Sequence, residues 1–375
     1  MKLLFPIFRY FPHGGLQRDM LRIAEAALRR GHSVTICTMA WQSEAKPPVG
    51  LEVKILKVSG LSNHSRAGRF VAKVHEFAAT AKFDLIVGFN RMPGLDIYFA
   101  ADNCFAKSSA RHPAWMRKVL PRYRTFLEYE RAIFAPESKV RILYLAPRQK
   151  RDFIEIYGTQ EERFTLLPPG ISPDCRREQN HAEIREAKRA EFGVSQGEFL
   201  LLEVGSGYRT KGVDRTLLAL SMLPENLQKK TKLFIAGREK SRKFEKLALK
   251  LGISNNVIFG GGRDDVNELL LAADLVVHPA RNEAAGNVLI EAIAMGTPVI
   301  CTANCGFSDY VEKSGGVVLP DMFDQSAFAA SLEVILADPS KLAQMRTNAV
   351  SCGNNADFYR RADVAVDAIE EVCHG

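Results

Sequence analysis

Short apolar runs alternate with longer amphipathic segments along almost the whole chain of 375 residues. A strand that is buried on both faces of a parallel sheet is apolar throughout, whereas a helix that covers such a sheet has a single apolar face. The alternation therefore predicts an α/β fold in which parallel sheets are flanked by helices.

The apolar runs place strands in both halves of the chain. In the first half they predict strands at residues 3–8, 33–39, 51–58, 85–89, 96–101, 140–145 and 164–167. In the second half they predict strands at residues 199–204, 232–236, 257–259, 275–278, 299–302 and 316–319. The first crossover helix is expected at residues 17–30, because Met20, Ile23 and Ala27 share one face and Gly31 suits a C-terminal cap.

The two halves are separated by the sequence Pro-Pro-Gly-Ile-Ser-Pro at residues 168–173, which is too rich in breakers to continue a helix or a strand. We expect two doubly wound, Rossmann-like domains at residues 1–167 and 175–354, joined by a linker at 168–174. A chain of this length can form two domains that each have a core of their own.

The cysteines and the N-terminus favour a cytoplasmic protein. The seven cysteines are scattered, odd in number and often set in apolar runs, as expected of reduced thiols. Cys301 and Cys305 lack a second pair at zinc-finger spacing, so we expect no metal site. Pro6 and Arg9 interrupt the apolar start, which predicts a buried strand rather than a signal peptide. No stretch is long enough to span a bilayer.

The positive charge is concentrated in the first half of the chain. Residues 1–165 hold 27 Lys and Arg against 15 Asp and Glu, while residues 166–375 hold 24 against 28. Residues 103–127 contain six cations, no acid and interleaved aromatic side chains, which suits a membrane surface of acidic lipids. The alternatives are a solvated helix face and a stacking platform for nucleic acid. The residues predicted to bind the membrane are Lys107, Arg111, Trp115, Arg117, Lys118, Arg122, Tyr123 and Arg124.

The sequence E-A-A-G-N-V-L-I-E, from Glu283 to Glu291, places two carboxylates around an expected helix start near Ala285. Glu283 would lie in the loop before the helix and Glu291 about two turns into it, so that both can contact one elongated ligand. The N–H groups of Ala285, Gly286 and Asn287 would favour an anion such as a diphosphate. The alternative is an ordinary amphipathic helix with a solvated glutamate at each end.

Three further segments narrow the interpretation. They are Y-F-P-H-G-G-L-Q-R-D at residues 10–19, G-F-N-R-M-P-G-L-D at 88–96 and K-G-V-D-R at 211–215. With the Glu-x7-Glu motif, the chain from residue 1 to about 350 resembles the retaining glycosyltransferases of the GT-B class, family 4 type. It is most similar to those that add the first hexose to the heptose region of the lipopolysaccharide core.

The resemblance implies two domains with a cleft between them. The first would bind the acceptor and face the membrane, with residues 355–375 packing back on it, and the second would bind the nucleotide sugar. The implied reaction is retaining, metal-independent transfer of a hexose, expected to be α-linked glucose, from a UDP-sugar to a heptose of the lipopolysaccharide inner core. It implies no cofactor and no nucleic-acid partner, and a peripheral position on the cytoplasmic face of the inner membrane.

The second domain supplies the expected donor contacts. Lys211 follows a strand and a glycine turn at the sheet edge where α/β domains bind ligands, so we expect it to contact the diphosphate, with Arg209 as a second cation. The resemblance assigns Glu283 to hydroxyls of the donor sugar and Glu291 to the ribose diol. Arg263 is expected near the base. The alternative for the two cations is a flexible surface loop.

The first domain supplies the expected contacts around the acceptor. Gly14 and Gly15 lie between the first strand and the first helix, where their backbone can approach a phosphate or the transferred hexose, or simply form a tight turn. Asp19 is expected to face the cleft. Asp102 ends a strand, where many relatives carry a histidine near the acceptor. The alternative for Asp19 is a negative charge near the N-terminus of a helix, and the alternative for Asp102 is a helix or turn cap.

Other interpretations of the same residues remain open. His278 ends a buried strand and is interpreted as a structural histidine with its hydrogen bonds satisfied. Another GT-B enzyme would share the fold, for example a UDP-sugar epimerase or a transferase of a different UDP-hexose or UDP-N-acetylhexosamine. The basic aromatic segment argues against an enzyme that has no lipid-linked acceptor. A basic nucleic-acid-binding protein would leave Lys211 and the glutamate pair unexplained.

Overall fold

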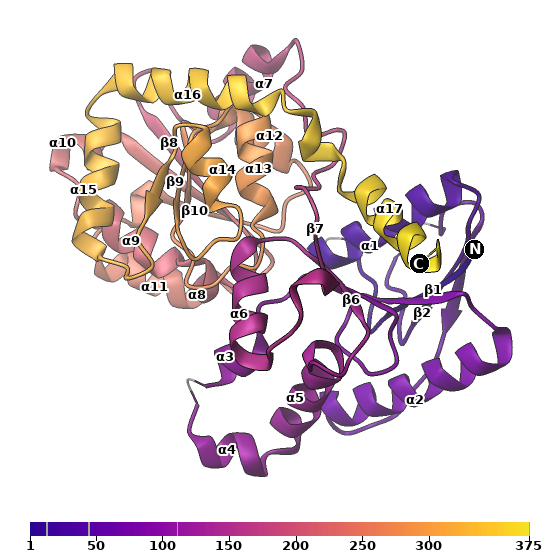
Figure 1. Ribbon diagram of the computed structural model, residues 1–375. Coiled ribbons are helices and arrows are strands. Elements are labelled where there is room, and N and C mark those ends of the chain that lie inside the picture. Colours follow the sequence, from indigo (N-terminus) through magenta and orange to yellow (C-terminus); the bar gives the residue numbers. More distant parts are fainter. Residues whose placement is uncertain (13, 44–45, 111, 375) are drawn as a thin grey trace. The chain divides into compact units, whose positions relative to one another are not determined.

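The computed structural model describes residues 1–12, 14–43, 46–110 and 112–374 (Figure 1). The chain forms two compact units. The first combines Met1–Gly170 with Tyr359–Gly375, and the second is Ile171–Phe358. The second unit thus begins inside the segment that the sequence predicts as a linker, and the C-terminal segment belongs to the first unit.

The first unit is built on a parallel sheet of seven strands in the order β3-β2-β1-β4-β5-β6-β7. Its strands are β1 Lys2–Ile7, β2 Ser33–Thr38, β3 Leu51–Ile55, β4 Leu85–Gly88, β5 Ile97–Ala100, β6 Arg141–Tyr144 and β7 Phe164–Leu166. Its helices are α1 Gly15–Arg29, α2 Asn63–Ala81, α3 Phe105–Ser109, α4 Ala114–Val119, α5 Pro121–Phe134, α6 Pro147–Tyr157 and α17 Arg361–His374. The α/β architecture predicted from the apolar runs is confirmed.

The second unit is a parallel sheet of six strands in the order β10-β9-β8-β11-β12-β13. Its strands are β8 Phe199–Val204, β9 Thr231–Ala236, β10 Val257–Gly261, β11 Leu275–His278, β12 Val299–Thr302 and β13 Val317–Leu319. Its helices are α7 His181–Glu191, α8 Tyr208–Lys211, α9 Val213–Ser221, α10 Glu225–Gln228, α11 Arg242–Lys250, α12 Val266–Ala272, α13 Asn287–Ala294, α14 Ser308–Lys313, α15 Gln325–Leu336 and α16 Pro339–Gly353. Leu201, Val277 and Ile300 of the sheet pack against Leu217 and Leu332 of the helices in its core.

Each sheet has one point where the strand order reverses. In the first sheet it lies between β1 and β4, and in the second between β8 and β11. The loops that leave two such neighbouring strands run in opposite directions and open a crevice at the carboxyl edge of the sheet, where ligands of open α/β sheets bind. We therefore expect ligand sites at the loops after β1, β4, β8 and β11.

Helix α17 packs against α1 and completes the first unit (Figure 1). Arg361 lies at the start of α17, is 2% exposed, and donates from Nη1 to Asp19 Oδ2 at 2.8 Å. Burial raises the pKa of Asp19 even though Arg361 acts to lower it. The expectation that Asp19 faces a cleft is wrong, because its carboxylate is enclosed and holds the last helix of the chain to the first.

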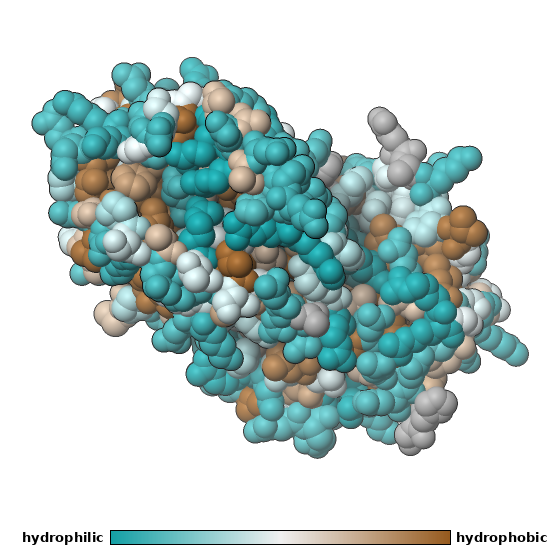
Figure 2. Space-filling model, turned by 90° about the horizontal axis from the view of Figure 1, so that it is seen from above, coloured by the Kyte–Doolittle hydropathy of each residue, from teal (hydrophilic) through white to brown (hydrophobic). Residues whose placement is uncertain are grey.

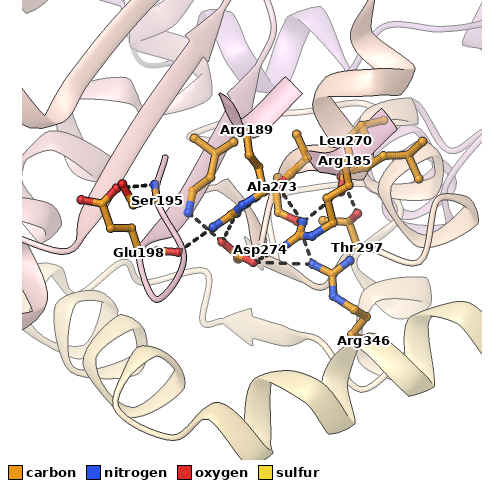
Figure 3. A network of polar contacts seen from close by, with 12 residues as sticks. Arg185, Arg189, Ser195, Glu198, Leu270, Ala273, Asp274, Thr297 and Arg346 are labelled. Atoms are coloured by element: carbon orange, nitrogen blue, oxygen red, sulfur yellow. Dashed lines mark hydrogen bonds and ion pairs between the residues drawn. The ribbon is translucent and has the colours of Figure 1, made fainter. Parts of the chain in front are cut away.

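A cluster of three arginines surrounds Asp274 at the amino end of β11 (Figure 3). Arg189 Nη1 donates to Asp274 Oδ2 at 2.7 Å, and Arg185 Nη2 bonds to Oδ1. Arg185 Nη1 also donates to the carbonyls of the last two residues of α12 and of Ala273, at 2.6–2.9 Å. Arg346 Nη2 donates to the Ala273 carbonyl at 2.8 Å. The arginines thus satisfy the end of α12 and dock α7 and α16 beside it.

The described residues contain no helix that is both long and apolar enough to cross a membrane. The cysteines are free. Most of the molecular face in Figure 2 is hydrophilic, with apolar side chains gathered in separate groups.

Candidate functional site

Lys211 and Glu283 meet at the point where the strand order of the second sheet reverses. Lys211 is the last residue of α8, which follows β8, and Glu283 lies in the loop after β11. Lys211 Nζ donates to Glu283 Oε2, with the two side chains 20% and 16% exposed. The predicted pair of donor-contacting residues is therefore brought together at the sheet edge where a ligand is expected.

Two glycines allow the loops after β8 and β11 to approach each other. Gly212 has a φ of +94°, and a Cβ added there would lie 2.3 Å from the Pro279 carbonyl oxygen. Gly205 has a φ of +141°, and the Lys211 side chain lies over it, with Cε 3.1 Å from the position of an added Cβ. A larger residue would clash with the Pro279 carbonyl at position 212 and would crowd the Lys211 side chain at position 205, and both positions have a φ that favours glycine.

His278 is the third member of the cluster. It is fully buried at the end of β11, and its Nε2 lies 3.4 Å from Glu283 Oε2. Because a carboxylate only accepts hydrogen bonds, Nε2 is the protonated nitrogen. His278 Nδ1 has no hydrogen-bond partner among the described residues. The interpretation of His278 as a satisfied structural histidine is thus wrong: among the described residues, its ring makes a hydrogen bond to the predicted catalytic residue Glu283 and leaves Nδ1 without a partner.

The charges of this cluster keep Glu283 ionised. Burial raises the pKa of a carboxyl, but the His278 hydrogen bond and the Lys211 charge outweigh it and lower the pKa of Glu283 to about 2. At neutral pH, Glu283 is a carboxylate that accepts hydrogen bonds and cannot donate a proton.

Backbone hydrogen bonds hold the glutamate loop against the turn after β12. The Glu283 N–H donates to the Asn304 carbonyl at 3.2 Å, and the Ala285 carbonyl accepts from the Phe307 N–H at 2.9 Å. Helix α13 begins at Asn287, with Gly286 as its N-cap at a φ of +92°. The helix thus starts two residues later than predicted, and Glu291 lies about one turn into it.

A second ion pair supports the loop that carries Arg209. Arg281 donates from both terminal nitrogens to the two oxygens of Asp214, each at 2.7 Å, and from Nη1 to the Arg209 carbonyl at 2.6 Å. Burial raises the pKa of Asp214, but Arg281 more than compensates and lowers it. Asp214 and Arg281 were not predicted as site residues, although each lies within three residues of one that was.

The structure does not bring Arg263 to this site. Its guanidinium donates to Asp265 from Nε at 2.7 Å and approaches Glu191 at 3.4 Å. Arg263 follows β10, which is the edge strand of the sheet and is separated from β11 by β9 and β8. Arg263 thus joins two acidic side chains away from the Lys211–Glu283 pair, and its contact with the base stays a prediction.

Glu203 is a buried carboxyl group next to the cluster. It lies on β8, is 1% exposed, and neither carboxyl oxygen has a hydrogen-bond partner among the described residues. Burial raises the pKa of Glu203 to about 8, although nearby Lys211 acts to lower it. Among the described residues, no cation forms an ion pair with Glu203.

The predicted residues of the first unit lie in different settings. A Cβ added to Gly14 would lie 1.9 Å from Gln17 Oε1, so the Gln17 side chain packs closely against this turn. Gly15 has open space beside it and is exposed at the start of α1. Asp102 is exposed just after β5, at the carboxyl edge of the first sheet.

The segment predicted to bind a membrane folds as α3, α4 and the first part of α5. Its exposed apolar side chains are Trp115, Val119 and Leu120, which are 63%, 66% and 36% exposed. Lys107 is not a free surface cation, because its Nζ contacts Asp152 at 2.6 Å and Glu155 at 3.1 Å. Arg111 lies outside the described residues, and Lys118, Arg122 and Arg124 are exposed beside the apolar group, where Arg117 and Tyr123 are half-buried.

Within the residues that the structure describes, no group of three or more His, Cys, Asp and Glu side chains is placed to hold a metal ion.

Two family models match the chain, one in each half. Residues 13–174 match the glycosyltransferase family 4 model, and residues 184–351 match the model of glycosyl transferases group 1. The lipopolysaccharide glucosyltransferase WaaG of Escherichia coli (strain K12) is 40% identical over 370 residues, which cover 98% of both chains. The chain belongs to this glycosyltransferase family. The crystal structure of WaaG, a glycosyltransferase involved in lipopolysaccharide biosynthesis, matches with a TM-score of 0.92 over 98% of this chain and 99% of that one.

More distant members of the same fold are also similar. A D-inositol 3-phosphate glycosyltransferase of Xylanimonas cellulosilytica is 26% identical over 94% of this chain and 91% of its own length. The crystal structure of Anabaena Alr3699/HepE in complex with UDP and glucose is 19% identical, with a TM-score of 0.76 over 99% of this chain and 100% of that one. At 19% identity, the similarity to Alr3699/HepE shows a shared fold alone.

Proposed function

We propose that this glycosyltransferase moves glucose from UDP-glucose to a heptose of the lipopolysaccharide inner core with retention of the α configuration. One observation carries the proposal: the Lys211–Glu283 pair lies at the β8–β11 reversal point of a chain that is 40% identical over nearly its full length to a lipopolysaccharide glucosyltransferase. The reaction needs no metal ion and no cofactor.

Lys211 stabilises the leaving diphosphate. Its ammonium group is held over Gly205 at the carboxyl edge of the sheet, and it reaches a phosphate oxygen by exchanging part of its contact with Glu283. The N-terminus of α13, with Gly286 and Asn287, adds the positive end of a helix dipole, and Arg209 adds a second cation. Such preorganised positive groups act on the charge that develops as the glycosidic bond breaks.

Glu283 orients the donor sugar and Glu291 the ribose. A carboxylate makes charge-assisted hydrogen bonds to hydroxyl groups, and Glu283 remains ionised because its pKa is lowered to about 2. The bond from the sugar carbon to the phosphate oxygen breaks, and the bond to the acceptor oxygen forms on the same face. The acceptor proton passes to the departing phosphate, with Asp102 of the first domain near the acceptor.

The enzyme works as a peripheral protein on the cytoplasmic face of the inner membrane. Trp115, Val119 and Leu120 enter the lipid interface while Lys118 and Arg122 meet anionic headgroups. Lys107 takes no part, because it is paired with Asp152 and Glu155. The lipid-linked acceptor then lies in the same surface as the docked domain.

A transfer assay tests the proposed reaction. The purified chain is incubated with lipopolysaccharide that ends at the inner-core heptose and with UDP-glucose, UDP-galactose or UDP-N-acetylglucosamine, with and without EDTA. We expect transfer from UDP-glucose that is insensitive to EDTA, and an α-linked product by NMR. Transfer from another UDP-sugar would correct the donor, conversion of UDP-glucose without an acceptor product would indicate an epimerase, and loss of activity in EDTA would contradict the metal-independent mechanism.

Vesicle co-sedimentation tests the membrane contact separately. Changing Arg117, Lys118, Arg122 and Arg124 together to Gln should remove most binding to anionic vesicles, because each cation contributes about 1 kcal/mol near such a surface. The matched control changes the four cations of α11 (Arg242, Lys243, Lys246 and Lys250) to Gln and should retain binding. Equal binding by both variants would show that the α4–α5 segment is a solvated face.

A further inference from the structure

The first unit contains a pocket at the reversal point of its own sheet. The pocket has a volume of about 340 Å³, in the lower part of the range of about 300–1,000 Å³ that is typical of small-molecule sites. Phe8 and Arg9 line it just after β1, and Asn90 lines it just after β4. The pocket thus occupies the position in the first sheet that the Lys211–Glu283 pair occupies in the second.

The polar lining of the pocket is positive. Arg9 and Arg66 are its two charged residues, and no carboxylate belongs to the described residues that line it. The Arg9 guanidinium makes no hydrogen bond or ion pair in the described part of the chain. Arg66 Nη2 donates to Asn63 Oδ1 at 2.6 Å, which holds its guanidinium beside the pocket. Two arginines without an acid suit the bidentate recognition of a carboxylate or a phosphate.

The N-terminus of α2 strengthens this positive field. Asn63 is the first residue of α2, a helix of 19 residues, and Asn63, Arg66 and Ala67 of its first turns line the pocket. The Ser62 side chain accepts the Ser65 N–H, so the cap satisfies only part of the first turn. The positive end of the helix dipole therefore faces the same space as Arg9 and Arg66.

The remaining lining suits a saccharide. Gln17, Asn63 and Asn90 contribute amide groups, and Phe8 and Phe126 contribute aromatic rings. Asn90 Oδ1 accepts the Phe8 N–H at 2.7 Å, which leaves the Asn90 amide nitrogen as a donor toward the pocket. Amides bind sugar hydroxyls, and ring faces pack on the apolar faces of a pyranose. Phe126 comes from α5, the helix that also carries Arg122 and Arg124 of the proposed membrane segment.

We infer that this pocket binds an anionic saccharide of the acceptor, with Arg9 and Arg66 on its carboxylate or phosphate group. The inference rests on the proposed function, because it assigns the part of the acceptor that this domain recognises. Arg9 and Arg66 are then residues that determine acceptor specificity. They hold a charged sugar next to the sugar that receives the glucose and do not take part in bond breaking.

Ligand-observed NMR on the full chain, saturated with UDP to fill the donor site, tests the pocket directly. The probes are glucose 6-phosphate, glucuronate and glucose. We expect at least one anionic sugar to bind about tenfold or more tightly than glucose, as charge-assisted hydrogen bonds predict. The stronger anionic probe identifies the group, phosphate or carboxylate. Equal binding of all three sugars, or no binding of any, would overturn the inference.

Variants test whether the anionic sugar binds in this pocket. The Arg9→Gln/Arg66→Gln double variant should lose the preference for the anionic probe, whereas Arg69→Gln should keep it. Arg69 is a matched control on the same helix, exposed and bonded to the Ser59 carbonyl at 2.8 Å, outside the pocket. If the double variant and the control bind the anionic probe equally, the site is elsewhere and the inference fails.

Steady-state kinetics separate this inference from the proposed function. With heptose-terminated lipopolysaccharide as acceptor, the double variant should raise the acceptor KM about tenfold with little change in kcat or in UDP affinity. An unchanged acceptor KM in an active double variant would overturn the inference alone. Failure of the wild type to transfer glucose would instead contradict the proposed function, and the NMR result would still decide the pocket.

Discussion

Strand β11 has a buried charge cluster at each end, and the two clusters differ in the number of cations around one carboxylate. At the amino end, Asp274 faces Arg185, Arg189 and Arg346, and these guanidinium groups also bind backbone carbonyls (Figure 3). At the carboxyl end, Lys211 and His278 are the basic side chains that pair with Glu283 among the described residues. The first cluster is saturated with hydrogen bonds, whereas the second keeps acceptor and donor capacity for a ligand.

The choice of cation follows the same division. Arginine presents a rigid fork of donors that can bind a carboxylate and helix carbonyls at once, which suits a permanent joint between α7, α12 and α16. Lysine presents a compact charge on a flexible stem, which suits a group that shifts from a glutamate to an incoming phosphate. We therefore expect changes at Asp274 to affect mainly stability and changes at Glu283 mainly turnover.

The largest effect is expected from Glu283→Ala. Removing the carboxylate that orients the donor sugar should lower kcat/KM on the order of 10³-fold while the melting temperature stays nearly constant. Glu225→Ala is the control, because the side chain of Glu225 is 79% exposed in its pair with Lys229. An active Glu283→Ala enzyme would contradict the assignment of the carboxyl-end cluster to catalysis.

Asp274→Ala should lower the stability of the protein and leave UDP binding unchanged. Three guanidinium groups would lose their buried counter-ion, which costs about 3 kcal/mol or more and lowers the melting temperature by roughly 10 °C. Thermal unfolding followed by circular dichroism measures this loss. UDP affinity by calorimetry at 25 °C should be unchanged. A parallel loss of UDP affinity would show that the amino-end cluster also serves the binding site.

Lys211→Ala should reduce turnover on the order of 10²-fold, because Arg209 and the N-terminus of α13 alone would then stabilise the leaving diphosphate. It should also weaken UDP binding in calorimetry. Lys211→Arg separates charge from shape: if the compact ammonium matters, arginine should restore UDP binding but only part of the turnover. Full activity of the arginine variant would remove the contrast between the two kinds of cation.

Glu203 extends the comparison to a buried carboxyl without a cation. Its pKa is raised to about 8 in the folded chain, above the 4.5 of a free glutamate. The folded state therefore favours the protonated form, and stability that is present at acid pH is lost as the pH rises from about 5 to 9. Glu203→Gln has no such proton, so it should gain about 2.5 kcal/mol relative to the wild type between pH 5 and pH 7. Identical pH profiles of the melting temperature would contradict this.

The smallest effect is expected at His278. His278→Leu removes the hydrogen bond to Glu283 and should lower kcat about tenfold, while His278→Gln restores a donor near Nε2 and recovers most of the loss. In the Glu283→Ala background, His278→Leu should have no further effect on residual turnover. Additive losses in this double-mutant cycle would mean that the histidine acts independently of Glu283.

Local patterns allowed the strands, and the meeting of Lys211 with Glu283, to be predicted from the sequence. Apolar runs mark parallel strands, and Lys211 and Glu283 follow strands that meet at a reversal point. Contacts between distant residues were not predictable. Asp19 pairs with Arg361, 342 positions away, and the edge position of β10, which separates Arg263 from the Lys211–Glu283 pair, depends on strand order. The start of α13 was misplaced because the Ala285 carbonyl is bonded to Phe307 rather than to the helix.

Because Asp19 pairs with Arg361, the first unit cannot complete its fold until the last helix of the chain has been synthesised. The first unit includes Tyr359–Gly375, so its last helix leaves the ribosome only after the whole of Ile171–Phe358 has been made. At about 5–20 residues per second, translation of that stretch takes about 10–40 s. Throughout this time the nascent first unit exposes the face of α1 that α17 will cover, and Asp19 lacks its cation. Truncation of the chain before Arg361 is therefore expected to destabilise the first unit, although most of that unit is synthesised first.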